Sequence, residues 1–118
     1  MLEKIWHTEV GGDAPRIPFL PQAEEKVEIW IGSFPVEWGQ QVWIEFRVNG
    51  SGEWKKITCN WQYNSQENSY WRALITSIPK DTSVEYKIRG RQHNVRIADE
   101  SIYSFTPGVS SSPAPGGP

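Results

Sequence analysis

The sequence feature that most constrains the fold is a strict alternation of apolar and polar side chains in QQVWIEFRVNG. One side of the alternation holds Val42, Ile44, Phe46 and Val48, and the other holds Trp43, Glu45 and Arg47. A period of two predicts a β-strand with one buried face and one face toward solvent. The Asn-Gly pair that ends the run is typical of a tight turn between antiparallel strands.

Runs of the same kind recur along most of the chain. They are VEIWIGS, EWKKITCNW, YWRALITSI, VEYKIRG, NVRIA and SIYSF. With the first run they make about seven short strands, and no amphipathic helix of useful length separates them. At 118 residues the chain has room for one domain of ordinary size. The sequence therefore predicts an all-β fold, an antiparallel immunoglobulin-like β-sandwich.

Composition divides the chain into three parts. Residues 1–26 contain GGDAPRIPFLPQAEEK, which is rich in Pro and Gly, and this predicts an extended lead-in anchored by Ile17, Phe19 and Leu20. Residues 27–106 carry the strand pattern. Residues 107–118 are rich in Pro, Gly and Ser, and this composition predicts a flexible linker to a further module.

Charge and motifs argue against several classes of function. The formal net charge is -2 and the pI is about 5.7, so there is no basic face for nucleic acid and no polybasic membrane signal. No apolar run approaches the length of a membrane span. One Cys and two His match no zinc spacing, and no phosphate-binding loop is present. We therefore expect no metal, no cofactor and no catalytic residue in this chain, and Cys59 is expected to be a small buried side chain.

The seven tryptophans fall into two predicted groups. Trp61 and Trp71 are in phase with apolar neighbours and are predicted to lie in the core, while Trp6 is predicted to plug one open end of the sandwich. In contrast, Trp30, Trp43 and Trp54 are out of phase with the apolar face of their strands. Trp38 falls in the turn PVEWGQ, where its ring is expected near the surface.

Two interpretations of the outward tryptophans remain open. Flat indole rings held on a rigid sheet suit the C–H faces of sugar rings, with neighbouring polar groups bonding the hydroxyls; the candidates are Glu28, Gln40, Gln41, Arg47 and Asn60. Alternatively, the rings are covered by the N-terminal segment or by a neighbouring domain, because an exposed apolar patch marks some partner without naming it.

Several short motifs resemble a known kind of module. The strand VWIEFRV, the hairpin carrying GEW, the strand YWRALI and the strand VEYKIR resemble immunoglobulin-like accessory domains of amylase-type glycoside hydrolases, including starch-binding modules. The resemblance covers residues 27–105. The chain departs from it near the end, where QHNVRIADESIYSF stands in place of a WDNN-like signature.

The resemblance implies a non-catalytic module that binds an oligosaccharide or polysaccharide, of α-glucan type, beside a catalytic domain in the same chain. By position it implies that sugar stacks on Trp30, Trp43 and Trp54, with Trp38 and Tyr63 behind them. The alternative function is a structural immunoglobulin or fibronectin-like domain whose aromatic face docks on a neighbouring domain.

Overall fold

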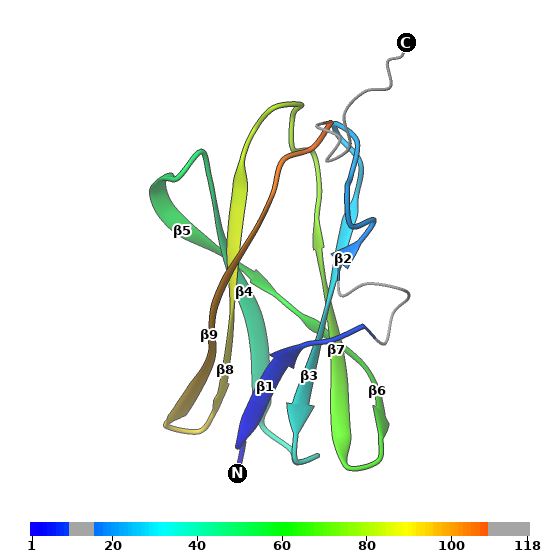
Figure 1. The fold of residues 1–118 in the computed structure, drawn as a ribbon. Coiled ribbons are helices and arrows are strands. Elements are labelled where there is room, and N and C mark those ends of the chain that lie inside the picture. Colours follow the sequence, from blue (N-terminus) through cyan, green and yellow to red (C-terminus); the bar gives the residue numbers. More distant parts are fainter. Residues whose placement is uncertain (10–15, 109–118) are drawn as a thin grey trace.

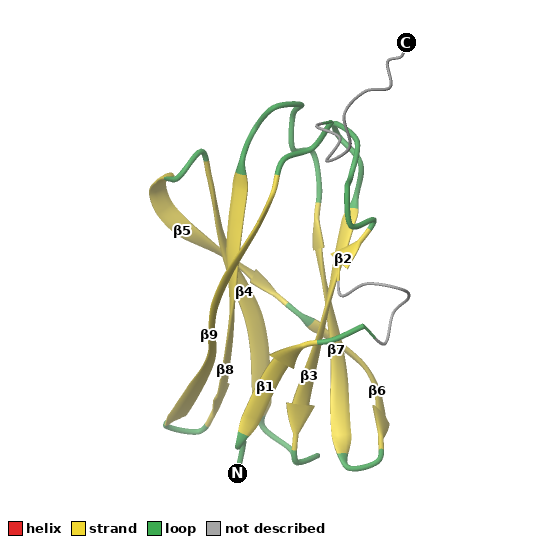
Figure 2. Cartoon of the chain, viewed as in Figure 1, coloured by secondary structure: helices red, strands yellow, loops and turns green. Residues whose placement is uncertain are grey.

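The described part of the chain forms strands joined by turns and loops. A computed structural model describes residues 1–9 and 16–108, and Figure 2 shows that this part contains no helix. Nine strands are present in these residues: β1 (Lys4–His7), β2 (Arg16–Ile17), β3 (Val27–Phe34), β4 (Gln40–Val48), β5 (Ser51–Thr58), β6 (Asn60–Ser65), β7 (Asn68–Ile75), β8 (Val84–Gln92) and β9 (Val95–Phe105).

The strands form two antiparallel sheets packed face to face. One sheet, here called sheet A, has the order β1-β3-β7-β6, with β2 also paired to β3; sheet B has the order β5-β4-β8-β9. Figure 1 shows the two sheets side by side. The order β1-β3-β7-β6 matches the four-stranded sheet of an immunoglobulin domain. Sheet B matches the three-stranded sheet, with β5 as one additional edge strand. The predicted fold class is confirmed.

The strand boundaries differ from the prediction at both ends of the chain and in the middle. The segment 1–26 supplies β1 and β2, which both pair with β3. The predicted run EWKKITCNW is divided between β5 and β6, which belong to different sheets. The two last candidates, NVRIA and SIYSF, are parts of the single strand β9.

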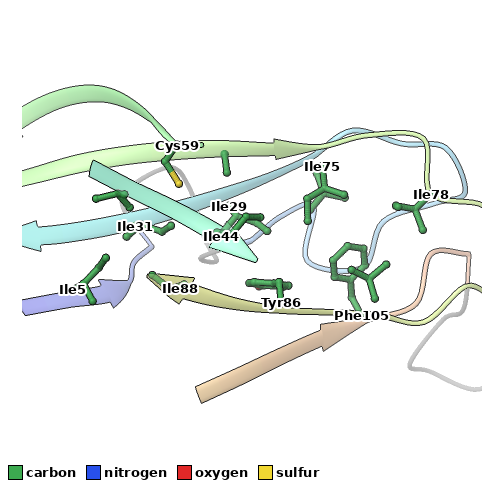
Figure 3. Packing of buried hydrophobic residues seen from close by; sticks show 14 residues of the cluster. Ile5, Ile29, Ile31, Ile44, Cys59, Ile75, Ile78, Tyr86, Ile88 and Phe105 are labelled. Atoms are coloured by element: carbon green, nitrogen blue, oxygen red, sulfur yellow. The ribbon is translucent and has the colours of Figure 1, made fainter. Parts of the chain in front are cut away.

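The core lies between the inner faces of the two sheets. Alternate residues of β3, β4, β7 and β8 fill it, and Figure 3 shows their side chains interdigitating. Ile29, Ile31, Ile44 and Ile88 are fully buried, as the period-two pattern predicts. Tyr86 is the largest fully buried side chain.

Strand β1 closes one side of the sandwich. Its hydrogen bonds join it to β3 of sheet A, while Leu2 and Ile5 pack on Gly90 of β8 in sheet B. A Cβ at Gly90 would lie 2.9 Å from Cδ1 of Ile5 and 3.0 Å from Cδ2 of Leu2, so the absence of a side chain lets both residues pack closely on β8. The N-terminal segment is therefore packed into the sandwich through β1.

The predicted anchors of the N-terminal segment are not the residues that hold it. Phe19 and Leu20 are exposed and Ile17 is only half-buried, whereas Pro21 is fully buried. Its carbonyl oxygen accepts a hydrogen bond from the Gly108 amide at 2.9 Å, next to the buried Pro107. Two residues of the predicted linker thus pack on the domain, and residues 109–118 of that prediction lie outside the described part.

A buried polar cluster joins the N-terminal strands to sheet B. The Arg16 side chain is 5% exposed and donates to the Phe19 carbonyl at 2.9 and 3.0 Å and to the Tyr86 hydroxyl at 3.2 Å. The Tyr86 hydroxyl lies 3.0 Å from Nε2 of His7, whose ring stacks on Tyr103 at 4.4 Å between centroids. Burial, followed by the nearby Arg16 charge, lowers the pKa of His7 to about 4.

The chain crosses from sheet B to sheet A at Cys59. The Cys59 amide donates to the Val42 carbonyl at 2.9 Å, and its thiol is buried in the core, as predicted. Burial raises the pKa of this thiol to about 12, which leaves it protonated and unreactive at neutral pH. Cys59 serves as a packing residue at the crossover.

The described residues hold no group of three or more His, Cys, Asp or Glu side chains placed to bind a metal ion. Within residues 1–9 and 16–108 no helix has the length and apolar character needed to cross a membrane.

Candidate functional site

A groove rich in tryptophan opens where the β3–β4 turn meets the β6–β7 hairpin. Figure 1 shows both connections at the end of the sandwich that also carries the N-terminus. The groove has a volume of about 540 Å³, within the range of roughly 300 to 1,000 Å³ that is common for small-molecule sites. We call it the tryptophan groove, and its walls are Val36, Glu37, Trp38, Gly39, Gln40, Trp61, Asn64, Ser69 and Trp71.

Three indole rings line this groove at different depths. Trp38, in the β3–β4 turn, is 96% exposed, and Trp61, on β6, is 53% exposed. Trp71 is half-buried opposite Trp61 in the β6–β7 register, and its Nε1 donates to Oγ of Ser33 at 2.9 Å. Solvent therefore reaches two large apolar rings beside a third that is fixed in the sheet.

Hydrogen bonds hold the exposed ring of Trp61 in place. Its Nε1 donates to Oδ1 of Asn64 at 2.8 Å, and the same oxygen accepts from Oγ of Ser69 at 2.7 Å. On the opposite wall, the backbone carbonyl of Trp38 accepts from Nε2 of Gln92 at 2.9 Å. Because the Trp61 ring is ordered before any ligand arrives, a sugar that stacks on it costs little additional side-chain entropy.

Gln40 lines the groove and carries an unpaired side-chain oxygen. Its Nε2 donates to the Pro35 carbonyl at 2.7 Å, which fixes the orientation of the amide. Its Oε1 is buried and has no hydrogen-bond partner among the described residues. A buried acceptor without a partner carries a desolvation cost that a ligand hydroxyl would relieve.

One acidic side chain lies on the wall of the groove. A hydrogen bond from the Met1 amine, followed by one from Gln92, lowers the pKa of the exposed Glu37 carboxyl. Glu37 is consequently ionised at neutral pH and offers two acceptor oxygens beside Trp38.

The three tryptophans that were predicted to stack on sugar do not share one surface. Trp30 is on the outer face of sheet A, because its strand neighbours Ile29 and Ile31 point into the core. Trp43 and Trp54 are on the outer face of sheet B, on the opposite side of the sandwich. No single ligand face can contact all three.

The prediction that Trp43 faces water is wrong, because a charged side chain covers the ring. The Lys56 ammonium lies 4.5 Å from the ring centroid, Nε1 donates to Glu45 at 3.1 Å, and the side chain is 7% exposed. Trp54 is half-buried between Arg47, at 4.4 Å from its ring centroid, and Lys87, at 4.1 Å. These cation–π contacts occupy the ring faces that stacking would need.

The remaining predicted site residues are spread over both sheets. Glu28 accepts from Nε1 of Trp30 at 3.0 Å, and Arg47 donates to Glu85 at 2.8 Å, so both already have partners. Asn60 is exposed on β6, and Tyr63 is exposed with its ring 5.1 Å from that of Tyr70. A ligand role for these residues stays a prediction.

Comparison with known proteins identifies the relatives of this chain. A family model described as "Lmo2446-like, N-terminal" matches residues 4–71. The chain belongs to this family. An isomaltosyltransferase of Sporosarcina globispora is 26% identical over 112 residues, which is 89% of this chain and 10% of that enzyme.

Two solved structures from Listeria monocytogenes share the fold of this Lmo2446-like domain. Protein lmo2446 of strain EGD-e, in complex with α-D-glucose, β-D-glucose, magnesium and calcium, is 28% identical with a TM-score of 0.78. A cycloalternan-forming enzyme in complex with a pentasaccharide substrate is 26% identical with a TM-score of 0.78. In both cases 89% of this chain is covered and 10% of the other.

The Lmo2446-like domain thus spans about a tenth of the length of the relatives it matches. Its relatives include parts of much larger saccharide-active enzymes, which agrees with the predicted resemblance to accessory domains of such enzymes.

The sequence interpretation misplaced Trp61, one of the tryptophans that line the groove. Trp61 was predicted to lie in the core, in phase with Ile57 and Cys59, but those residues precede the crossover and Trp61 follows it. Trp61 points to the inner side of β6, the edge strand of its sheet, where no strand of sheet B covers it. Trp71 packs against the core, as predicted.

A bulge on β6 separates two aromatic residues that alternation would place together. Trp61 pairs with Trp71, and Tyr63 pairs with Tyr70, the residue directly before Trp71 in β7. Gln62 is therefore an extra residue without a partner position on β7. Trp61 therefore faces the groove, and Tyr63 faces the outer side of sheet A. The segment NWQYNSQENSYW indicates a polar hairpin between two tryptophans, but it does not indicate which face either ring takes.

Trp6 is also placed differently from its prediction as an end plug. It pairs with Gly32 on the outer side of sheet A, and its ring covers that glycine. Gly32 pairs in turn with Tyr70, which pairs with Tyr63. These residues, Trp6, Gly32, Tyr70 and Tyr63, form a cross-strand row that we call the outer aromatic row.

Proposed function

We propose that this chain is a non-catalytic carbohydrate-binding module of a larger α-glucan-active enzyme, and that the tryptophan groove is its sugar site. The observation that carries the proposal is the pair of exposed indoles, Trp38 and Trp61, at a groove with fixed polar groups. The sugars named with the related structures and the name of the related isomaltosyltransferase support the choice of α-glucan.

The groove has the two chemical elements that sugar recognition needs. Apolar rings suit the C–H faces of a pyranose, and acceptors such as Gln40 Oε1 and Glu37 suit its hydroxyl protons. Because the site is open and buries little of each sugar, we expect a dissociation constant of roughly 10 µM to 1 mM.

The first test is a calorimetric titration of the chain with maltose, isomaltose and longer α-glucan oligosaccharides. We expect Trp38→Ala and Trp61→Ala each to weaken binding by about tenfold or more, because each removes one stacking ring. Both side chains are exposed, so the melting temperature should change little.

A matched control comes from a tryptophan outside the groove. Trp54→Ala removes an indole that Arg47 and Lys87 already cover, and it should leave sugar affinity unchanged. Loss of binding in Trp30→Ala or Trp54→Ala, with normal binding in Trp38→Ala and Trp61→Ala, would return the sugar site to the outer faces and reject the groove.

A second candidate function is supported by the outer aromatic row and the neighbouring Trp30. These rings give sheet A an apolar strip suited to docking on an adjacent domain of the same enzyme. In that case Tyr63→Ala and Tyr70→Ala would lower the melting temperature of the complete enzyme more than that of this chain alone, and no saccharide would bind the chain.

A further inference from the structure

A second, smaller hollow lies beside the tryptophan groove. The second hollow has a volume of about 150 Å³ and shares Gln40 and Trp71 with the groove. Its far walls are Trp43 on β4 and Lys56 and Thr58 on β5. Gln40 and Trp71 are thus common walls of the two hollows, and Cys59 at the crossover also lines the smaller one.

The junction between the hollows is where the unpaired acceptor lies. Gln40 lines both hollows, its amide nitrogen is held by the Pro35 carbonyl, and its Oε1 is buried without a partner among the described residues. A hydroxyl donor at the junction would satisfy this oxygen.

The far walls have the chemistry of a second sugar subsite. The Lys56 ammonium and the Thr58 hydroxyl are exposed donors, and the Lys56 head is held over the ring of Trp43 at 4.5 Å. These two donors can hydrogen-bond the hydroxyls of a sugar unit, and the ring of Trp71 gives the same hollow an apolar wall.

We infer that the site takes an oligosaccharide of at least two sugar units. The first unit stacks in the tryptophan groove, the next enters the hollow beside Thr58 and Lys56, and a hydroxyl between them donates to Gln40 Oε1. This inference rests on the proposed function, because it specifies the length of the ligand for the same site.

The test is a length series measured by calorimetry on the unmodified chain, with methyl α-D-glucoside, isomaltose, maltose and isomaltotriose. We expect the better disaccharide to bind about tenfold more tightly than the monosaccharide, since a second unit adds contacts at a site that is already ordered. The third unit should add less than about threefold, because the two hollows are then filled.

One variant locates the second unit. Thr58→Trp fills the second hollow and should remove the gain from mono- to disaccharide, while the affinity for methyl α-D-glucoside stays within about twofold. The matched control is Thr76→Trp, which alters an exposed threonine that lines neither hollow and should keep the gain. Melting curves verify that both variants fold. If Thr58→Trp does not fold, the length series on the unmodified chain decides whether the site takes two sugar units.

The outcomes separate this inference from the proposed function. Equal affinity for one and two sugar units, or a gain that persists in a folded Thr58→Trp variant, would overturn the two-unit site and leave sugar binding intact. The absence of binding to every saccharide would overturn both the two-unit site and the proposed sugar-binding function.

Discussion

Gly32 is the residue on which the ring of Trp6 rests. A Cβ at this position would lie 2.7 Å from Nε1 of Trp6 and closer still to two ring carbons, so even alanine would push the indole away. We expect Gly32→Ala to destabilise the chain by about 1–3 kcal/mol, the usual cost of overpacking a close contact. Chemical denaturation measures this change directly.

A double-mutant cycle separates the clash from other effects of the substitution. In a Trp6→Ala background the ring is absent, so the additional cost of Gly32→Ala should fall close to zero. An equal cost in both backgrounds would show that Trp6 does not require the glycine.

His7 makes the stability of the fold depend on pH. Its pKa is about 4 in the folded chain and near 6.5 when it is unfolded, so between these values only the unfolded state binds the proton. Stability should therefore be fully present above pH 6.5 and fall as the pH is lowered toward 4. We expect a loss of roughly 2 kcal/mol, allowing for partial solvent screening of the half-buried ring.

The measurement is the free energy of unfolding at a series of pH values for the unmodified chain and for His7→Gln. The variant keeps a neutral acceptor near the Tyr86 hydroxyl and should flatten the slope between pH 6.5 and 4. His93→Gln is the control, because it alters the other histidine at an exposed hairpin turn. An unchanged slope in His7→Gln would assign the pH dependence to the carboxyl groups.

At the scale of elements, β1 connects the two sheets. It is hydrogen-bonded to β3 in sheet A, while its Ile5 and the preceding Leu2 pack on Gly90 in sheet B. We expect Leu2→Ala and Ile5→Ala each to cost about 2–4 kcal/mol, typical of a large side chain removed from a packed site. Thermal or chemical unfolding would measure this loss of stability, with Lys4→Ala at an exposed position as the control. If all three variants had equally small effects, β1 would contribute little to the stability of the fold.

The strands show what periodicity can and cannot predict. Within β3 and β8 the alternation named the main buried residues, because each of these strands stays in one sheet; in β4 it named Val42 and Ile44 but missed the buried Trp43. Between Thr58 and Tyr63 the chain changes sheets and then bulges at Gln62. Each event shifts the phase, and neither leaves a glycine or proline in the sequence to mark it, so the face of Trp61 could not be predicted.

At the scale of the whole molecule, the fold class followed from the sequence but the site did not. Seven alternating runs sufficed for a two-sheet sandwich. Trp43 and Trp54 occupy outward positions of their strands, and this was interpreted as exposure to solvent. In the structure Lys56 lies over Trp43, and Arg47 and Lys87 lie over Trp54. Long cationic side chains on neighbouring strands can cover a ring, and that depends on pairing partners known only once the strand order is known.

The groove itself arises from the shape of the sandwich. It forms at one end, where the β3–β4 turn approaches the edge strand β6, and its residues come from segments about 20 to 30 positions apart in the sequence. No local motif records that meeting. Trp38 alone was predicted correctly as exposed, since a turn position leaves few neighbours to cover a large ring.

The bulge at Gln62 has a further consequence for how copies of this chain meet. Among residues 1–9 and 16–108, no strand pairs with the outer side of β6, and such an edge can template pairing with another molecule. A bulge interrupts the regular ladder that intermolecular pairing requires, and it sits in the middle of the strand. The feature that turns Trp61 toward the groove therefore also protects the open edge against aggregation.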